Sequence, residues 1–220
     1  MTPRALVLTG RGRYEDPWHD HAATSHVVAR TLGTMGIEAE VRSLFPDSMG
    51  DLTDYALVVV NAGHGRVDPD FDGDHAAWVP AHRAMMSFID AGGAVLGLHQ
   101  AAGTFADNTR WGAALGGRWV WGHSMHPPQE LATFRPTGDH PIAVGLDPVV
   151  VDDEQYCHLV LEPGSQVFLT TRHEGTDHPV AWVSATGRVV YDSLGHDVGS
   201  YASPSRLALL RREVDWLLDR

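Results

Sequence analysis

The sequence predicts an α/β fold in which helices flank a mainly parallel central sheet, with an irregular antiparallel extension in the second half. Residues 55–61 and 94–98 are continuous apolar runs, which are typical of central parallel strands covered on both faces. Helical patterns separate the apolar runs of the first half, and this alternation implies right-handed crossovers between parallel strands. The second half holds short strand-like segments between loops that contain Pro and Gly, which favour antiparallel pairing.

Strands and helices alternate along the first half of the chain. In order, we expect a strand over 4–9, a helix over 22–35, strands over 37–42 and 55–61, a loop over 62–74, a helix that ends near residue 91 and a strand over 94–98. In the first helix, Val27, Leu32 and Met35 lie at near-helical spacing and Gly36 ends the pattern. This order predicts that the first half forms the parallel part of the sheet.

Short strands and one clear helix are expected in the second half. The candidate strands lie at 118–121, 131–135, 166–171, 179–184 and 188–192. The final helix begins after Ser203, a good N-cap, with Pro204 at its first position, and it extends to Arg220. Its apolar face consists of Leu207, Leu210, Val214, Leu217 and Leu218. No internal repeat or long linker divides the sequence, so we expect residues 1–220 to form a single domain.

Charge and cysteine content exclude several classes of protein. The chain carries 16 Lys and Arg against 28 Asp and Glu, a formal net charge of −12, so nucleic acid and membranes are not expected partners. The one cysteine, Cys157, permits no internal disulfide and fits a reducing compartment. The apolar run at 5–8 is too short for a signal sequence or a membrane span, and we expect a cytoplasmic protein.

The strand over 94–98 ends in a turn of small residues with His99 at its apex. A corner between a strand and a helix presents one side chain above the sheet, and in several hydrolase families that side chain is the nucleophile. An imidazole rarely acts as an acyl-forming nucleophile, but it binds metals, moves protons and donates hydrogen bonds. We therefore expect His99 at an exposed functional corner. An ordinary hydrogen-bonded histidine at a strand end is the alternative.

Two further groups are expected near His99. His196 also follows a predicted strand, and Glu154 lies in an acidic loop that reaches the same edge of the sheet. We interpret His99, His196 and Glu154 as catalytic acid–base residues. Candidate ligands of a divalent metal such as zinc lie in neighbouring loops: His21, His123 and His126. These histidines bind the metal alone or together with the three catalytic residues.

Aromatic residues predict a surface for a sugar. Trp119 and Trp121 alternate in a short expected strand, and an indole ring complements the apolar face of a pyranose. The candidate substrate-binding residues are Gln100, Trp119, Trp121, Tyr156 and Asp197. The turn at 10–13 contains two glycines but lacks the third glycine and the Lys-Ser/Thr pair of nucleotide sites, so no nucleotide cofactor is expected.

Six short segments carry a resemblance to a known family. They are Gly97–His99, Leu115–Trp119, His140–Ile142, Asp153–Tyr156, Pro179–Trp182 and Gly187–Asp197. In this order the segments resemble the ThuA-like (trehalose utilisation) family, from the first strand to the last helix. The resemblance implies a flavodoxin-like sheet of the class I glutamine-amidotransferase type. It also implies a role in sugar or glycoside catabolism, beside NAD-dependent sugar oxidoreductases that make keto-sugars.

Two classes of function follow from these residues and the resemblance. The first is an enzyme of isomerase, lyase or hydrolase type that acts on a sugar or keto-glycoside, with His99 or His196 as the base and Glu154 as its orienting group or as the acid. The second is a catalytically silent sugar-binding or regulatory module that works with a partner oxidoreductase. Either class is compatible with a homo-oligomer.

Glutamine amidotransferase and cysteine peptidase activities are not expected. The class I amidotransferase fold uses a cysteine at the elbow, where this chain has His99. Cys157 lies beyond an acidic run and has no elbow around it, so we expect it to be a small buried residue.

Overall fold

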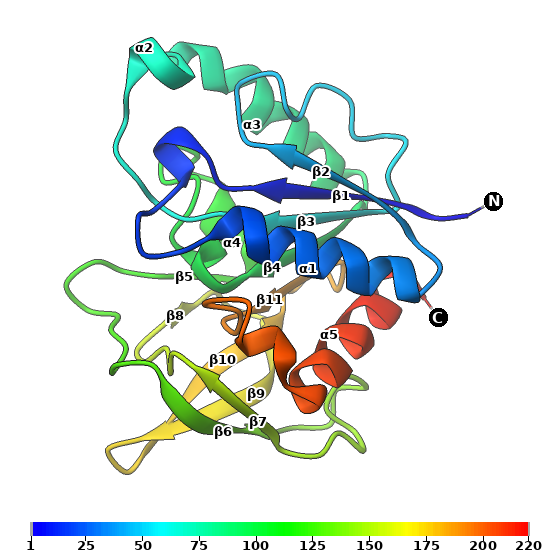
Figure 1. Ribbon diagram of the computed structural model, residues 1–220, viewed down its shortest axis with the longest axis vertical. Helices are drawn as coiled ribbons and strands as arrows, with labels where there is room; N and C mark the ends of the chain where they lie inside the picture. Colours follow the sequence, from blue (N-terminus) through cyan, green and yellow to red (C-terminus); the bar gives the residue numbers. More distant parts are fainter. Residues whose placement is uncertain (1, 220) are drawn as a thin grey trace.

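The computed structural model describes residues 2–219 and contains a nine-stranded mixed sheet (Figure 1). Five neighbouring strands run parallel, and the other four continue the sheet in antiparallel pairs. In sheet order the strands are β2 (Glu38–Ser43), β1 (Arg4–Thr9), β3 (Leu57–Asn61), β4 (Ala94–Leu98), β11 (Val189–Asp192), β10 (Thr176–Val183), β9 (Gln166–His173), β6 (Glu130–Pro136) and β7 (Val149–Asp153). A separate two-stranded sheet pairs β5 (Gly117–Arg118) with β8 (Val160–Leu161).

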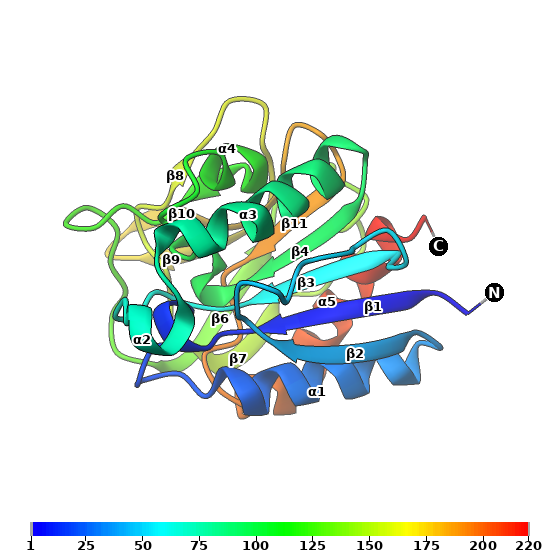
Figure 2. The ribbon, with the colours of Figure 1, turned by 90° about the horizontal axis from the view of Figure 1, so that it is seen from above.

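Helices cover both faces of the parallel strands (Figure 2). The helices are α1 (His21–Thr34), α2 (Pro69–Asp72), α3 (His75–Asp90), α4 (Trp111–Leu115) and α5 (Pro204–Leu217), with 3-10 turns η1 (Gly12–Tyr14), η2 (His99–Ala102) and η3 (Ser200–Ala202). Buried side chains of α1 and α5 pack on one face, and those of α3 and α4 pack on the other. Side-chain caps fix the start of the long helices: Asp20 accepts a hydrogen bond from Ala23 N, and Ser203 accepts one from Arg206 N.

The core explains why β3 and β4 are continuous apolar runs. Every residue of both strands is buried, because helices cover both of their faces. Val59 pairs in register with Leu96, and each lies between β-strand neighbours on both sides. The parallel core predicted from the sequence is thereby confirmed.

The parallel strands end at one level of the sheet. Thr9, Asn61, Leu98 and Asp192 are the last residues of β1, β3, β4 and β11, and they pair in register across the sheet. Because the loops after these strands all leave from one edge, side chains distant in sequence meet there.

Several sequence predictions need correction. The strand expected at 188–192 forms β11, but it pairs in parallel with β4 and belongs to the parallel core, because it fills the edge that β4 leaves open. The strand expected at 118–121 is limited to β5, since the chain leaves the sheet after Arg118. The helix α2 lies within the segment expected to be a loop, and β7 and β8 were not predicted. The predicted helix end at Arg220 lies outside the described residues.

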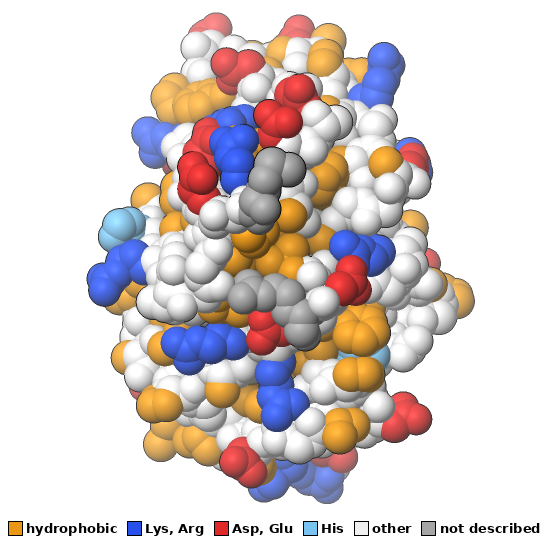
Figure 3. All heavy atoms as spheres, turned by 90° about the vertical axis from the view of Figure 1, so that its right-hand side faces the viewer, with side chains coloured by type: hydrophobic (Ala, Val, Ile, Leu, Met, Phe, Trp, Pro, Cys, Tyr) orange, Lys and Arg blue, Asp and Glu red, His pale blue; other side chains and the backbone are white. Residues whose placement is uncertain are grey.

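The surface carries charged side chains of both signs (Figure 3). On the face in Figure 3, acidic and basic side chains are interspersed and apolar side chains are scattered. Within residues 2–219, no helix has both the length and the apolar character needed to cross a bilayer.

Candidate functional site

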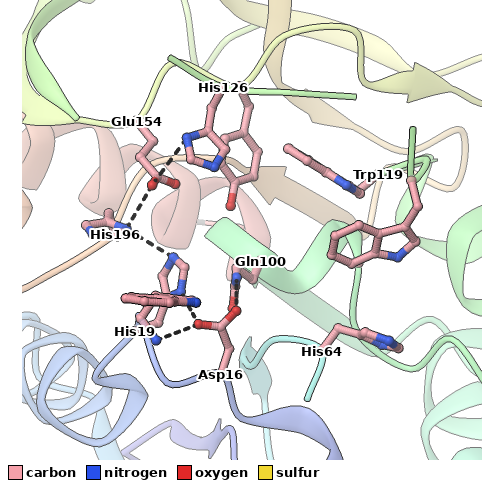
Figure 4. Close-up of a pocket in the computed structure, with 12 residues that line it drawn as sticks. Asp16, His19, His64, Gln100, Trp119, His126, Glu154 and His196 are labelled. Carbon is pink, nitrogen blue, oxygen red and sulfur yellow. Dashed lines mark hydrogen bonds and ion pairs between the residues drawn. The ribbon is translucent and has the colours of Figure 1, made fainter. Parts of the chain in front are cut away.

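Four side chains converge where the parallel strands end. His19 comes from the loop after β1, His99 begins η2 directly after β4, and His196 lies in the loop after β11. Glu154 follows β7 at once. In the described part of the chain, one ligand-type atom from each of the four lies within 4.8 Å of the others. We name these four residues the His/Glu group (Figure 4).

The distances within the His/Glu group are short. His19 Nε2 lies 2.9 Å from His99 Nε2 and 3.0 Å from His196 Nδ1. Glu154 Oε1 lies 3.4 Å from His196 Nδ1, and Oε2 lies 3.5 Å from His99 Nε2. The four groups therefore surround a single point rather than forming a chain of separate pairs.

The tautomers of two of these histidines follow from their partners. His99 Nδ1 lies 2.6 Å from the carbonyl oxygen of Ser193, which only accepts, so Nδ1 carries the hydrogen. His19 Nδ1 lies 2.8 Å from Asp16 Oδ1, and a carboxylate also only accepts. In the neutral imidazoles, each Nε2 then carries a lone pair and no hydrogen. The lone pairs of His19 Nε2 and His99 Nε2 face each other across 2.9 Å. A cation toward which both lone pairs point would resolve this conflict.

A divalent metal ion fits the His/Glu group. Ligands of one tetrahedral zinc ion, at about 2.0–2.2 Å from it, lie about 3.3 Å from one another, close to the separations within the group. The contacts of His99 Nδ1 with a carbonyl and of His19 Nδ1 with a carboxylate are those that orient metal-bound histidines. Glu154 Oε2 is buried, and within the described residues it has no hydrogen-bond partner. The group can therefore hold a metal ion.

The electrostatics of the group favour an ionised Glu154. Burial raises the pKa of this carboxyl. Hydrogen bonds with His196 and His99 lower the pKa by more, so it lies well below its ordinary value. The hydrogen bond to Glu154 raises the pKa of His196. Burial, followed by repulsion from His99, lowers the pKa of His19 to about 4. At neutral pH the site thus offers a carboxylate and a neutral His19 imidazole, as a metal ion requires, whereas the raised pKa of His196 opposes metal binding.

The free energy of unfolding of the metal-free protein is expected to fall as the pH is lowered from about 6.5 to 4. Burial, followed by repulsion from His19, also lowers the pKa of His21 to about 4, whereas an unfolded histidine titrates near 6.5. In this window the unfolded chain takes up protons that His19 and His21 do not, so stability is present above the window and is lost within it. Urea denaturation at pH 7.5 and 4.5 with a chelator tests this, and equal stabilities would contradict it.

Two aspartates hold the site in place. Asp153 Oδ1 accepts hydrogen bonds from Glu154 N at 2.9 Å and His196 N at 3.2 Å, and Oδ2 accepts one from Gly195 N at 2.7 Å. Asp16 accepts from His19 Nδ1 and, at 3.0 Å, from Gln100 Nε2. Asp153 therefore joins the two loops that carry Glu154 and His196, and Asp16 orients His19.

A cleft of about 490 Å³ opens beside the His/Glu group. Its lining combines imidazoles, carboxylates and large aromatic rings (Figure 4). The lining residues are Asp16, Trp18, His19, His64, Gln100, Gly103, Trp119, Trp121, His126, Glu154, Tyr156 and His196. Tyr156 Oη lies 3.2 Å from His99 Nε2, so its hydroxyl points at the same place as the group.

The structure brings most of the predicted site residues together. His99, His196 and Glu154 lie within the His/Glu group, and the candidate sugar-binding residues Gln100, Trp119, Trp121 and Tyr156 line the cleft. His126 lines the cleft too, with Nδ1 3.3 Å from Glu154 Oε1, but it is not one of the four converging groups.

Three predicted residues lie elsewhere. His21 is the first residue of α1, and its ring packs against the backbone at Gly10 and Gly63. His123 lies outside the cleft, with its ring centroid 5.7 Å from that of His158. Asp197 accepts hydrogen bonds from Gln129 and from Ser200 N and does not line the cleft.

The expected exposure of His99 is wrong, since the residue is only 2 % exposed. Ser193, Tyr156 and His19 enclose its ring. The sequence assigned no role to Asp16 or Asp153, and of the two histidines that follow the first strand we expected His21, not His19, to bind the metal. Both His19 and His21 belong to the segment Trp18–His21. The helix α1 begins at His21, and this boundary determines that the two side chains point in different directions.

Cys157 cannot replace the missing elbow cysteine. The side chain is buried, and burial raises the pKa of its thiol to about 11. A thiol that remains protonated at neutral pH is a poor nucleophile.

Comparisons with known proteins agree with the fold. The family model ThuA, described as trehalose utilisation, matches residues 4–217. A ThuA-like protein from Parabacteroides merdae superposes with a TM-score of 0.77 at 15% identity, covering 100% of this chain and 91% of that chain. One from Bacteroides uniformis gives 0.76 at 15% identity, covering 98% and 91%. A glutamine amidotransferase from Thermotoga maritima gives 0.62 at 10% identity, covering 100% of each chain.

At these identities the structural likeness shows the fold alone, and the predicted glutamine-amidotransferase-like architecture is confirmed. No curated protein sequence matches the chain.

Proposed function

The chain belongs to the ThuA trehalose-utilisation family, and from this premise we propose that it is a sugar-processing enzyme of isomerase, lyase or hydrolase type. Its substrate is a sugar or keto-glycoside bound in the cleft beside the His/Glu group. The observation that carries the proposal is the convergence of four ligand-type groups on one point at the floor of a cleft with aromatic walls.

The proposed roles differ from a simple acid–base pair. His19, His99, Glu154 and His196 would hold a divalent ion such as zinc, which when bound would polarise a carbonyl or acidify a hydroxyl group of a substrate that joins it as a fifth ligand. As ligands, His99 and His196 are not free to act as the base, so this proposal replaces the role that the sequence suggested for them.

Two other side chains are placed to move protons. The hydroxyl of Tyr156 points at His99 Nε2, and His126 contacts Glu154 from the side of the cleft. His126 Nδ1 lies 3.0 Å from the carbonyl oxygen of Pro127, so Nδ1 carries the hydrogen and Nε2 is the basic nitrogen. Gln100 and Asp16 complete the polar lining and can bind sugar hydroxyls.

The test of this function is turnover by the wild-type protein. We expect a panel of keto-glycosides, trehalose-like disaccharides and their epimers to include a substrate that the zinc-loaded protein converts. Chelation should abolish the conversion and added zinc should restore it. Product analysis by NMR identifies the reaction type.

Two results would contradict the proposal. Saturable sugar binding without conversion would favour the catalytically silent module that serves a partner oxidoreductase. Conversion that chelation leaves unchanged would remove the metal ion from the mechanism. A cytoplasmic location and a homo-oligomeric state stay predictions.

A further inference from the structure

The wall of the cleft is a continuous series of aromatic rings that starts at the His/Glu group. The ring centroids of His99 and Tyr156 lie 4.8 Å apart, and those of Tyr156 and Trp119 lie 4.9 Å apart. The series continues from Trp119 to Trp121 at 6.0 Å and from Trp121 to His64 at 5.6 Å. The wall therefore extends well beyond the ring that contacts the group.

Exposure rises along this wall. Tyr156 is buried, Trp119 is half-buried, and Trp121 is 66% exposed. Trp18, which also lines the cleft, is 80% exposed. A tryptophan with this much surface in water buries little of its large apolar area in the free protein, and a stacked ligand ring would cover it. Trp121 thus provides a face for stacking, and it is the next ring after Trp119 in the series that leads away from the His/Glu group.

The charges of the cleft restrict the ligand further. Of the twelve described residues that line it, none is Lys or Arg. Asp16 and Glu154 contribute two carboxyl groups to the lining. Phosphate groups are bound by Arg, Lys or clustered backbone N–H groups. Because the two carboxylates balance the charge of a bound divalent ion, this cleft suits an uncharged ligand.

We propose that the cleft binds an unphosphorylated, uncharged glycoside of at least two rings, with one ring beside the His/Glu group and the second stacked on Trp121. This inference rests on the proposed function for the presence of a sugar, and it specifies which sugars fit. The inner ring meets Tyr156 and Trp119 and presents its hydroxyl or keto oxygen to the group. The outer ring covers the exposed face of Trp121.

The experiment measures the binding of sugars, and the turnover of the same sugars is measured as in the test of the proposed function. Isothermal titration of the zinc-loaded full-length protein uses methyl glucoside, three glucose disaccharides (trehalose, maltose and cellobiose), glucose and glucose 6-phosphate as probes. At least one disaccharide should bind about tenfold more tightly than methyl glucoside, and Trp121→Ala should remove this advantage. Trp121→Phe should retain most of it, because a ring face remains. Glucose 6-phosphate should bind more weakly than glucose.

The matched control is a substitution of an aromatic residue outside the cleft. Phe71→Ala removes an exposed aromatic ring that does not line the cleft, and it should leave every affinity unchanged. The inference would be overturned by any of four outcomes. These are equal affinity for sugars of one and two rings, an unchanged disaccharide affinity in Trp121→Ala, tightest binding of the sugar phosphate, or no binding of any probe. If the protein prefers disaccharides but converts no sugar, only the proposed enzymatic function is contradicted. If it converts a sugar but shows no preference for two rings, only the two-ring site is contradicted.

Discussion

Replacing Glu154 by glutamine is expected to lower sugar turnover by about 10²–10⁴-fold and to weaken zinc binding at least about 100-fold. The amide has almost the same shape, but it removes the one negative charge among the four groups that face His99 and His196. Glu154 also contacts His126 Nδ1 at 3.3 Å, so the substitution disturbs the group proposed to move protons. Steady-state kinetics and zinc titration measure the two effects.

The control for this variant is another glutamate outside the cleft. Glu130→Gln changes an exposed residue at the start of β6 and should leave turnover and zinc affinity unchanged. Full turnover in Glu154→Gln, with its melting temperature unaltered, would show that the carboxylate has no part in the reaction.

Replacing Asp153 by alanine is expected to destabilise the protein by about 3 kcal/mol or more. The carboxylate is fully buried and accepts hydrogen bonds from three backbone N–H groups, at Glu154, Gly195 and His196. Each buried donor left without a partner costs about 1–3 kcal/mol. For a chain of this size, about 3 kcal/mol corresponds to a decrease in Tm of roughly 6–12 °C.

Calorimetry of Asp153→Ala beside Asp152→Ala tests this expectation. Asp152 is the preceding residue and is exposed, so its replacement should change Tm little. Asp153→Ala should also lose zinc affinity, because the loops that carry Glu154 and His196 lose their common anchor. A Tm equal to that of the wild type would show that other contacts hold these loops.

The parallel core could be predicted because burial on both faces leaves a direct mark on the sequence. β3 and β4 are unbroken apolar runs, and β4 was predicted with the bounds that the structure has. The direction of β11 could not be predicted, because an isolated apolar strand carries no sign of which neighbour it pairs with. β7 was missed because its residue types do not alternate: Val150 is apolar but exposed, and Asp153 is charged but buried.

The site was predictable where it depends on strand ends and was not where it depends on side-chain direction. His99 and His196 follow strands whose last residues, Leu98 and Asp192, pair in register, so their proximity follows from topology. The choice between His19 and His21 depends on where α1 begins and on which ring the Asp16 carboxylate orients. Sequence spacing contains neither piece of information.

Replacing His99 is expected to cost stability, because the side chain is not at an exposed corner. An exposed histidine contributes little packing, but His99 is buried and its Nδ1–H bonds the Ser193 carbonyl oxygen. Loss of this side chain leaves a buried acceptor without its partner, which costs about 1–3 kcal/mol. Glu154→Gln is therefore the cleaner probe of the chemistry.

Zinc titration into metal-free protein without a histidine tag tests whether His19, His99, Glu154 and His196 hold one metal ion. We expect one zinc ion per chain in the wild type, binding weakened at least about 100-fold in His19→Ala, and binding retained in His21→Ala, two residues away. Absence of stoichiometric binding in the wild type, or equal zinc affinity in the wild type and His19→Ala, would contradict it.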